Sequence, residues 1–367
     1  MPLSPGEIDE FLTEGRALDA IALDVMTLAL ARRVSPDAPT FPLTVDALLD
    51  GLGCATIHRP LLRRWVSTLA AAGRITLEDN VIVSITNVRA STVERAWRGV
   101  DTTRAYPGYL RRALAQVPDL LTGELSPHTL MFGGPESAGG LDLSIAYAIY
   151  RDNPSSRMVN EAAGEWVAGH LNSLQRRGRI VELGAGTGAT TESVVLATQH
   201  ISPAPHYLFT DVSEEFLRHA HARFGDLVAT AIVDIARPLG PQVHATGGAV
   251  DVVVAANVAH NANDINAFCA EVRAVLADDG LLVLIETSVE RPQLLASAEF
   301  LMSGNEASHR PPTDARRTSG AMLPAVSEWT SALLCAGFTT IERLPHDDHP
   351  LAETGQFGYA ARVGSAR

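Results

Sequence analysis

The stretch Ile180–Thr191, IVELGAGTGATT, decides the fold class of this 367-residue chain. An apolar run ends in glycines at 184, 186 and 188, and a helix-like segment follows. Glycine lets the backbone approach a ligand closely, and the free N–H groups of a helix N-terminus attract ligand groups. The glycines alone do not identify the ligand, because Gly184, Gly186 and Ala189 also fit the G-x-G-x-x-G/A dinucleotide pattern loosely.

Three acidic residues near the ends of successive predicted strands favour a cationic nucleoside ligand over NAD. Glu182 lies directly before the glycines, where a carboxylate would repel a pyrophosphate. Asp211 follows the second strand and can accept hydrogen bonds from ribose hydroxyls. Asp234 and Ile235 follow the third strand, placed to meet the amino group and the ring face of adenine. Each acid could instead be a loop residue or a helix cap. Together they predict a site for S-adenosylmethionine (SAM), which has a sulfonium, an ammonium and no phosphate, formed by Glu182, Gly184, Ala185, Gly186, Asp211, Val212, Asp234, Ile235 and Asn257.

Residues 179–367 predict an α/β domain with a mainly parallel sheet. Short apolar strand candidates alternate with helix-like segments, and this alternation favours parallel strands joined by right-handed crossovers. TTIERL and QFGYAARV predict a closing pair of strands. The strand candidates are RIVELGAG, HYLFTDVS, VDVVVAANV and GLLVLIETS, and the helix candidates are Thr190–Thr198, Glu214–Phe224 and Ile265–Leu276.

Residues 1–115 predict a mainly helical, winged-helix-like domain. Three helix candidates precede RITLEDNVIVSI, which reads as a hairpin. Such a module either binds DNA or serves as a dimerisation or scaffold domain. The region carries 13 arginines against 13 acidic residues, so the basic excess of a DNA-reading module is missing, and dimerisation is favoured. Residues 116–178 are expected to form a helical connector and pocket lid. The helix candidates are Leu18–Val34, Val45–Leu52 and Pro60–Ala72.

The composition narrows the function classes. A net charge of −13 argues against nucleic acid or an anionic membrane as a partner. The sequence has no uncharged apolar run of about 18 residues, so we expect no membrane-spanning helix. Its first residues lack a signal-peptide pattern, so we expect no signal peptide. Cys54, Cys269 and Cys335 lie far apart, which fits reduced cytoplasmic thiols better than a disulfide framework or a metal site. All 29 basic residues are arginine, which excludes a Schiff-base lysine.

Four segments, ELGAGTGATT, LFTDVSEEFLRHAHARF, VVVAANVAHNANDI and LLVLIETS, resemble class I SAM-dependent methyltransferases. More narrowly, they resemble the carbon methyltransferase domains of polyketide synthases and their free-standing relatives. The likeness covers roughly residues 60–290 and implies a doubly wound, Rossmann-like seven-stranded sheet with SAM as methyl donor. It also implies that His260, in the AN-x-x-H segment, is the catalytic base and that Glu286 orients it. The sequence departs from the family after Glu286: residues 299–323 replace a Gly-Trp-Trp segment, which leaves the acceptor open.

The residues themselves support a His–Glu pair. Strands expected to end near Ala256 and Glu286 are separated by one helix, so they should be adjacent, about 4.8 Å apart, with His260 at the same sheet edge. Methyl transfer to carbon needs a base, and neutral imidazole suits an activated C–H near pH 7. A carboxylate on the other ring nitrogen fixes the tautomer and stabilises the imidazolium. The alternative is that His260 caps a turn and Glu286 pairs with an arginine.

Candidates for acceptor binding lie outside these motifs. Tyr150 and Arg157 precede the glycine loop and could close over the ligands. Arg310, Arg316 and Arg317 could clamp a carboxylate or phosphate of the acceptor, with a solvated loop as the alternative.

A carrier-protein-bound acceptor would need a basic docking patch, for which Arg176, Arg177 and Arg179 are candidates, whereas a free small molecule is the preferred acceptor. HDDHP, residues 346–350, is interpreted as a surface loop rather than a metal site.

We therefore expect a cytoplasmic, homodimeric SAM-dependent methyltransferase of bacterial specialised metabolism. It would methylate an activated carbon α to a carbonyl in a small molecule. Methylation of oxygen, nitrogen or sulfur by the same fold is the first alternative. A SAM-binding DNA regulator, or a protein that uses SAM as an electrostatic catalyst without methyl transfer, are the others.

Overall fold

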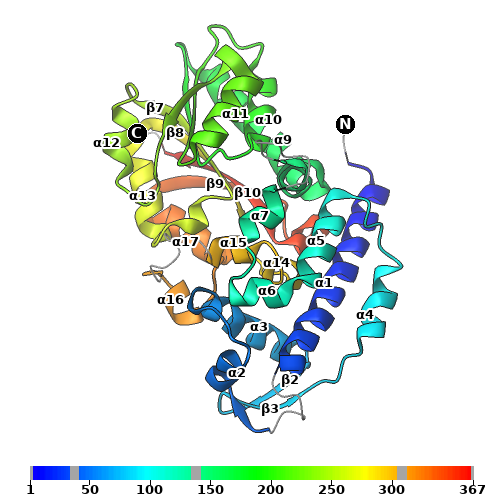
Figure 1. The fold of residues 1–367 in the computed structure, drawn as a ribbon. Coiled ribbons are helices and arrows are strands. Elements are labelled where there is room, and N and C mark those ends of the chain that lie inside the picture. Colours follow the sequence, from blue (N-terminus) through cyan, green and yellow to red (C-terminus); the bar gives the residue numbers. More distant parts are fainter. Residues whose placement is uncertain (1–2, 34–40, 134–141, 304–311, 365–367) are drawn as a thin grey trace. The chain divides into compact units, whose positions relative to one another are not determined.

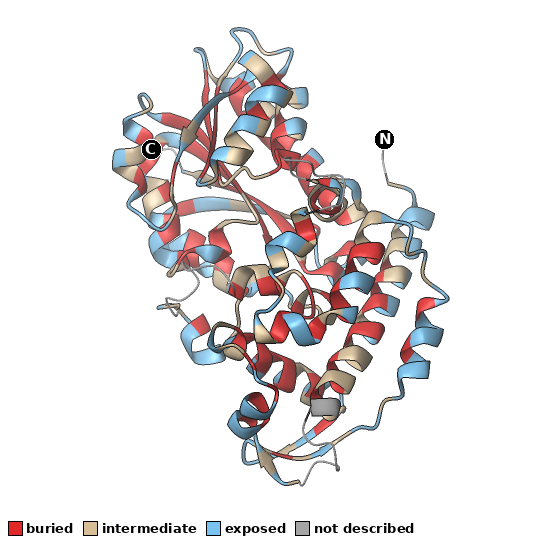
Figure 2. Cartoon of the chain, in the orientation of Figure 1, coloured by how far each residue is buried: buried red, intermediate tan, exposed pale blue. Residues whose placement is uncertain are grey.

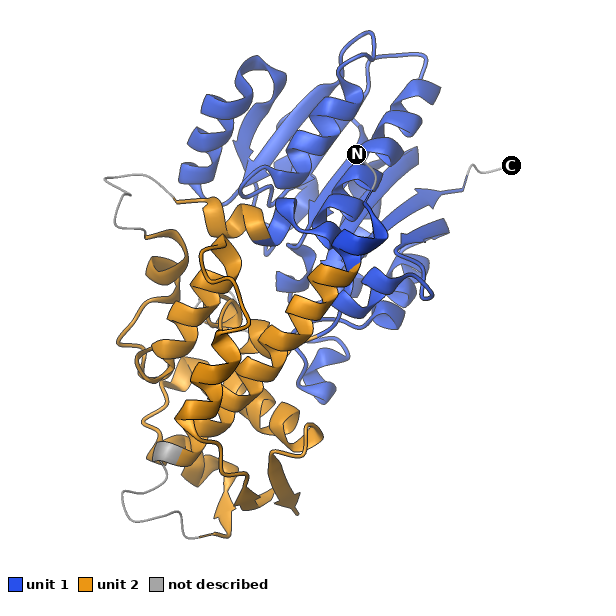
Figure 3. Ribbon diagram, turned by 90° about the vertical axis from the view of Figure 1, so that its right-hand side faces the viewer, with its two compact units in different colours: residues 1–8, 149–289, 311–367 blue, residues 9–148, 290–310 orange. Residues whose placement is uncertain are grey.

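The computed structural model forms two compact units, which Figure 3 distinguishes by colour. The chain leaves unit 1 after residue 289 and returns to it at residue 311. This division differs from the boundaries expected at residues 115 and 178, because a segment from the middle of the predicted methyltransferase domain joins the N-terminal unit. Unit 1 comprises residues 1–8, 149–289 and 311–367, and unit 2 comprises residues 9–148 and 290–310. The structure describes residues 3–33, 41–133, 142–303 and 312–364.

Unit 1 is built on a seven-stranded sheet with the order β6-β5-β4-β7-β8-β10-β9 (Figure 1). The five strands from β4 to β8 pair in parallel, and β10 is antiparallel to both β8 and β9. This confirms the expected Rossmann-like seven-stranded sheet with a closing strand pair. The strands are β4 (Arg179–Leu183), β5 (His206–Asp211), β6 (Ala229–Ile232), β7 (Val250–Ala256), β8 (Leu276–Thr287), β9 (Phe338–Leu344) and β10 (Gln356–Val363).

Helices cover both faces of this sheet, and the period-two alternation of the strands explains why. In β4, Val181 and Leu183 join one apolar cluster, whereas Ile180 joins the cluster on the opposite face. The central strands are therefore buried along their length (Figure 2). One cluster packs α12 (Leu239–His244), α13 (Ile265–Val275) and α17 (Val326–Cys335), and the other packs α9 (Pro154–Ser173), α10 (Ala189–Thr198) and α11 (Glu214–Phe224).

Asp264 sets the start of α13 and so ends the segment that carries His260. Its Oδ1 accepts hydrogen bonds from the backbone N–H groups of Asn266 at 2.8 Å and Ala267 at 3.2 Å. A carboxylate at this position satisfies donors that the first helical turn leaves free. The helix therefore begins at Ile265, where the sequence predicted it.

The N-terminal part of the chain is mainly helical and carries a small three-stranded sheet with the order β1-β3-β2. Asp79 and Asn80 take positive φ angles of 47° and 62°, as the turn of the predicted hairpin requires. The helix expected from Leu18 begins earlier, at Pro5. None of the helices in the described ranges is long and apolar enough to cross a membrane. The elements are α1 (Pro5–Arg33), β1 (Leu43–Thr44), α2 (Val45–Gly51), α3 (Arg59–Ala71), β2 (Ile75–Glu78), β3 (Val81–Ile85), α4 (Ala90–Trp97), α5 (Ala105–Ala115), α6 (Val117–Thr122), α7 (Pro127–Phe132) and α8 (Ser144–Tyr147).

The segment after residue 289 is anchored in unit 2 by buried polar contacts with α3. It forms α14 (Pro292–Leu295) and α15 (Glu299–Ser303). Arg64 Nη1 lies 2.5 Å from Glu299 Oε2 and 2.6 Å from Glu290 Oε1, and the Glu299 side chain is only 2% exposed. Trp65 Nε1 donates to the Leu295 carbonyl at 2.9 Å. These contacts make residues 290–303 part of the core of unit 2.

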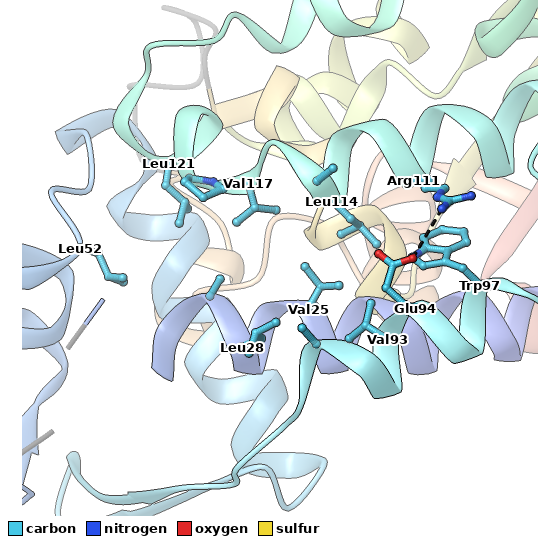
Figure 4. A pocket seen from close by; sticks show the side chains of 14 residues that line it. Val25, Leu28, Leu52, Val93, Glu94, Trp97, Arg111, Leu114, Val117 and Leu121 are labelled. Carbon is cyan, nitrogen blue, oxygen red and sulfur yellow. Dashed lines mark ion pairs between the residues drawn. The ribbon is translucent and has the colours of Figure 1, made fainter. Parts of the chain in front are cut away.

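Unit 2 also contains an apolar pocket of about 700 Å³ between α1, α4, α5 and α6 (Figure 4). Trp97, Leu114 and Val117 are among the side chains that line it. Glu94 and Arg111, also in its lining, form an ion pair with a separation of 3.6 Å. None of the residues predicted to bind SAM lines this pocket.

Replacing Arg64 by alanine should destabilise the protein by about 3–5 kcal/mol, because Glu299 would remain buried without its partner. Urea denaturation measures this change. Arg63→Ala is the matched control: Arg63 and its partner Asp46 are 47% and 61% exposed, so its loss should cost no more than about 1 kcal/mol. Equal free energies of unfolding for the two variants would contradict the structural role of the Arg64 network.

Candidate active site

The loop between β4 and α10 has a backbone that only glycine adopts easily. Gly184, Gly186 and Gly188 have φ angles of 56°, 54° and 74°. A Cβ atom on Gly184 would lie 2.3 Å from Cγ2 of Val258, which follows β7. The loop thus needs glycine for its conformation and for its close contact with the segment that carries His260.

Glu182, at the end of β4, is buried beneath this loop. Its Oε2 accepts hydrogen bonds from Thr191 Oγ1 at 2.5 Å and from the Tyr207 hydroxyl at 2.7 Å. Its Oε1 has no hydrogen-bond partner within the part of the chain that the structure describes. Burial raises the pKa of Glu182 to about 7. Oε2 of this carboxyl therefore binds the start of α10 through Thr191, and Oε1 can accept a hydrogen bond from a further donor.

The acids that follow β5 and β6 lie where the sequence predicts. Asp211 ends β5, is 7% exposed, and accepts the N–H of Gly186 at 2.9 Å and of Ser213 at 2.8 Å. Burial raises the pKa of its carboxyl. Asp234 follows β6, and its Oδ1 accepts the N–H of Ala236 at 2.8 Å. The next residues along the two loops, Val212 and Ile235, are exposed and partly buried, respectively.

The glycine cradle, the unpaired buried oxygen of Glu182 and the two acids suit SAM. The loop offers close approach without side chains, as an adenosyl ligand requires. The carboxyl groups offer acceptors for an ammonium group and for hydroxyls, and the three parallel strands bring them to the ligand-binding edge of the sheet.

His260 and Glu286 form a buried pair at the same edge. His260 lies in the 3₁₀ turn η4 (Ala259–Asn261), and its Nδ1 is 2.6 Å from Glu286 Oε2. The Glu286 side chain is fully buried and that of His260 is 9% exposed. A carboxylate only accepts hydrogen bonds, so a neutral imidazole in this position would carry its proton on Nδ1 and its lone pair on Nε2. Within the described residues, no hydrogen bond engages Nε2.

The second oxygen of Glu286 binds the backbone of residues 257–264, which lie between β7 and α13 and are called the His260 segment. Glu286 Oε1 accepts N–H groups from Val258 at 3.1 Å, Ala259 at 2.7 Å and His260 at 3.3 Å. Among the described residues, Glu286 thus pairs with His260 and its neighbours rather than with an arginine. Asn257, at the exit of β7, has a positive φ of 52°, which asparagine tolerates better than most residues.

The three candidate acceptor residues lie in different surroundings. Burial raises the pKa of the Tyr150 hydroxyl, and the nearby Glu286 carboxylate raises it further. Arg157 is partly exposed and lies 3.4 Å from Glu7. Arg316, expected to face the acceptor, is instead 2% exposed, with its guanidinium against the backbone of the His260 segment. The reason is that Asp314 and three backbone carbonyls satisfy its donors.

The remaining candidates do not gather into a site. Arg176 pairs with the buried Asp251 but is 55% exposed, Arg177 is also exposed, and Arg179 is 9% exposed, so two of these three arginines lie at the surface. Arg317 is exposed, and Arg310 lies outside the described residues. The HDDHP segment forms an exposed loop, and the described residues contain no cluster suited to a metal ion.

Sequence reasoning missed Asp314, Thr191 and Tyr207. Thr191 belongs to the glycine motif itself and could have been found there as a partner for Glu182. Asp314 and Tyr207 lie in segments without a recognisable motif, and only the fold brings them to their partners.

Comparison with known proteins agrees with this geometry. Residues 181–282 match the family described as "Methyltransferase domain". Pyochelin synthetase PchF of Pseudomonas aeruginosa is 30% identical over 88% of this chain, and polyketide synthase ThaQ of Burkholderia thailandensis is 30% identical over 74% of it. The chain spans only 18% and 13% of the lengths of these two relatives.

The crystal structure of the CurJ carbon methyltransferase is similar in fold, with a TM-score of 0.80 and 25% identity. The match covers 96% of this chain and 92% of that one. These matches show a class I SAM-dependent methyltransferase that is similar to the carbon methyltransferase domains of polyketide synthases.

Proposed function

We propose that this enzyme transfers a methyl group to an activated carbon α to a carbonyl in a small-molecule acceptor of bacterial specialised metabolism. The observation that carries the proposal is the 2.6 Å contact between His260 Nδ1 and Glu286 Oε2 at the ligand-binding edge of the sheet. An amine or thiolate acceptor could react without such a base, so the pair favours carbon or a hydroxyl over nitrogen and sulfur.

In this proposal SAM occupies the edge formed by β4, β5 and β6. The backbone of Gly184, Ala185 and Gly186 lies against it, and Glu182 is the acceptor available for its ammonium group. Asp211 and Val212 meet the ribose, whereas Asp234 and Ile235 meet the adenine. SAM supplies an electrophilic methyl group and a neutral thioether leaving group.

The residues of this chain would then handle one proton. His260 Nε2 removes the proton from the acceptor carbon, and that carbon forms the new bond to the methyl group. Glu286 stabilises the imidazolium through Nδ1 and holds the ring in place. Asn257, at the exit of β7, contacts SAM or the enolate oxygen. Tyr150, beside Glu286, and Arg157 are candidate contacts of the acceptor.

A carrier-protein-bound acceptor is the second candidate, supported by the names of the synthetase and polyketide synthase relatives. Of the three arginines first considered for docking, Arg179 is buried, whereas Arg176 and Arg177 are exposed and stay candidates for a docking surface. The homodimer and the winged-helix role of the N-terminal part stay predictions.

His260→Ala and Glu286→Gln should each lower kcat by about 10²–10⁴-fold, because the base or its orienting carboxylate is lost. SAM affinity should stay within about threefold, since neither side chain is assigned to SAM. The assay uses [methyl-¹³C]SAM with β-keto acids and β-keto thioesters, measures S-adenosylhomocysteine release, and locates the methyl group by NMR. A methyl group on oxygen would overturn the carbon assignment, and parallel losses of rate and SAM affinity would make the pair structural.

Gly184→Ala should weaken SAM binding at least about tenfold, since a left-handed backbone costs an L-residue roughly 1–2 kcal/mol and the new Cβ would overlap Val258. Isothermal titration with SAM measures the change. Gly240→Ala is the control, because nothing lies within 4 Å of the added Cβ there. If Gly184→Ala bound SAM as tightly as Gly240→Ala, the glycine loop would not be the SAM site.

A further inference from the structure

We infer that Arg316, held by Asp314, is a positioning residue for His260. It acts from the side of the His260 segment that Glu286 does not hold. The inference rests on the proposed role of His260 as the base, and it gives the divergent segment after residue 311 a part in the reaction.

The guanidinium of Arg316 bridges two carbonyls of this segment. Nη1 donates to the carbonyl of His260 itself at 2.6 Å, and Nη2 donates to the carbonyl of Ala262 at 2.7 Å. Nη1 also donates to the Met322 carbonyl at 3.3 Å. A planar fork of donors can span two carbonyls at once, whereas the single ammonium of a lysine cannot reproduce that geometry.

Asp314 fixes the guanidinium in turn. Its Oδ1 accepts Arg316 Nε at 2.9 Å, and its Oδ2 accepts Nη2 at 2.7 Å, with both side chains 2% exposed. Oδ2 also accepts the N–H of Ile265, at the start of α13, at 3.0 Å. Thr313 N donates to the Asn263 carbonyl at 2.8 Å. Residues 313–316 therefore contact the His260 segment along its second half.

Glu286 and Arg316 bind different backbone groups of the His260 segment. The carboxylate accepts the N–H groups of residues 258–260, and the guanidinium donates to the carbonyls of residues 260 and 262. His260 is the residue that both hold, one through its N–H and the other through its carbonyl. Its backbone is thus held on both sides of Cα, which limits the positions that the imidazole can take.

This arrangement predicts a loss of rate without a loss of cofactor binding. A displacement of about 1 Å in a reacting group can cost about 10²-fold in rate. Arg316→Ala and Arg316→Lys should therefore lower kcat about 10–100-fold, while the Kd for SAM stays within about threefold. Arg317→Ala, at the exposed neighbouring position, should leave kcat unchanged. Full activity of Arg316→Lys would overturn the inference, because a single charge would then suffice.

Two further measurements separate positioning from folding. Guanidinium chloride at millimolar concentration should restore part of the kcat of Arg316→Ala and none of that of Arg317→Ala. The double variant His260→Ala/Arg316→Ala should be no slower than His260→Ala, because Arg316 acts through His260. If the two losses multiply, Arg316 does not act through His260 and the inference fails.

The two proposals fail in different ways. If His260→Ala is fully active, the base assignment itself is wrong, whatever Arg316 does. If His260→Ala is slow but Arg316→Ala is as fast as the unchanged protein, only the positioning inference is wrong. Should Arg316→Ala not fold, Asp314→Asn makes the same test, with a smaller fall in kcat expected and unchanged kcat contradicting the inference.

Discussion

The buried carboxylate of Glu286 is the constraint on which the catalytic edge depends. A charge that is fully removed from water needs hydrogen-bond donors on every side, and the protein has to supply them. Three consecutive backbone N–H groups and the imidazole of His260 do so. The turn after β7 is consequently wound around this carboxylate. The parallel register of β7 and β8, which pairs Ala256 with Ile285, brings the turn to the carboxylate.

The same turn also closes against the donor side of the site. Val258 sits where a side chain on Gly184 would have to be, so the cradle for the cofactor and the segment of the base are in direct van der Waals contact. Each loop limits the conformations of the other. The distance between the proposed methyl donor and the proposed base thereby depends on the ends of β4 and β7 and on the absence of a side chain at Gly184.

Local patterns made much of this predictable. The helix Glu214–Phe224 was expected with the bounds it has, because its apolar spacing and the glycine after it are local signals. His260 and Glu286 could be paired because adjacent parallel strands bring their ends together. The role of Arg316 was not predictable: the two carbonyls that it binds near His260 lie 54 and 56 residues away, and an arginine in a polar segment looks like a surface residue. The interleaving of the two units was hidden for the same reason, since Arg64 and Glu299 are 235 residues apart.

Because residues 290–310 belong to unit 2, that unit cannot complete its core until these residues have been synthesised. On the ribosome the chain emerges from its N-terminus, so α3 is exposed long before α15 exists. Trp65 and Phe300, whose rings meet edge to face with centroids 6.0 Å apart, cannot make this contact until residue 300 has been synthesised. Until then, the surface of α3 that packs against α14 and α15 stays exposed. A fragment that ends before residue 290 would lack α14 and α15 and would keep that surface of α3 exposed.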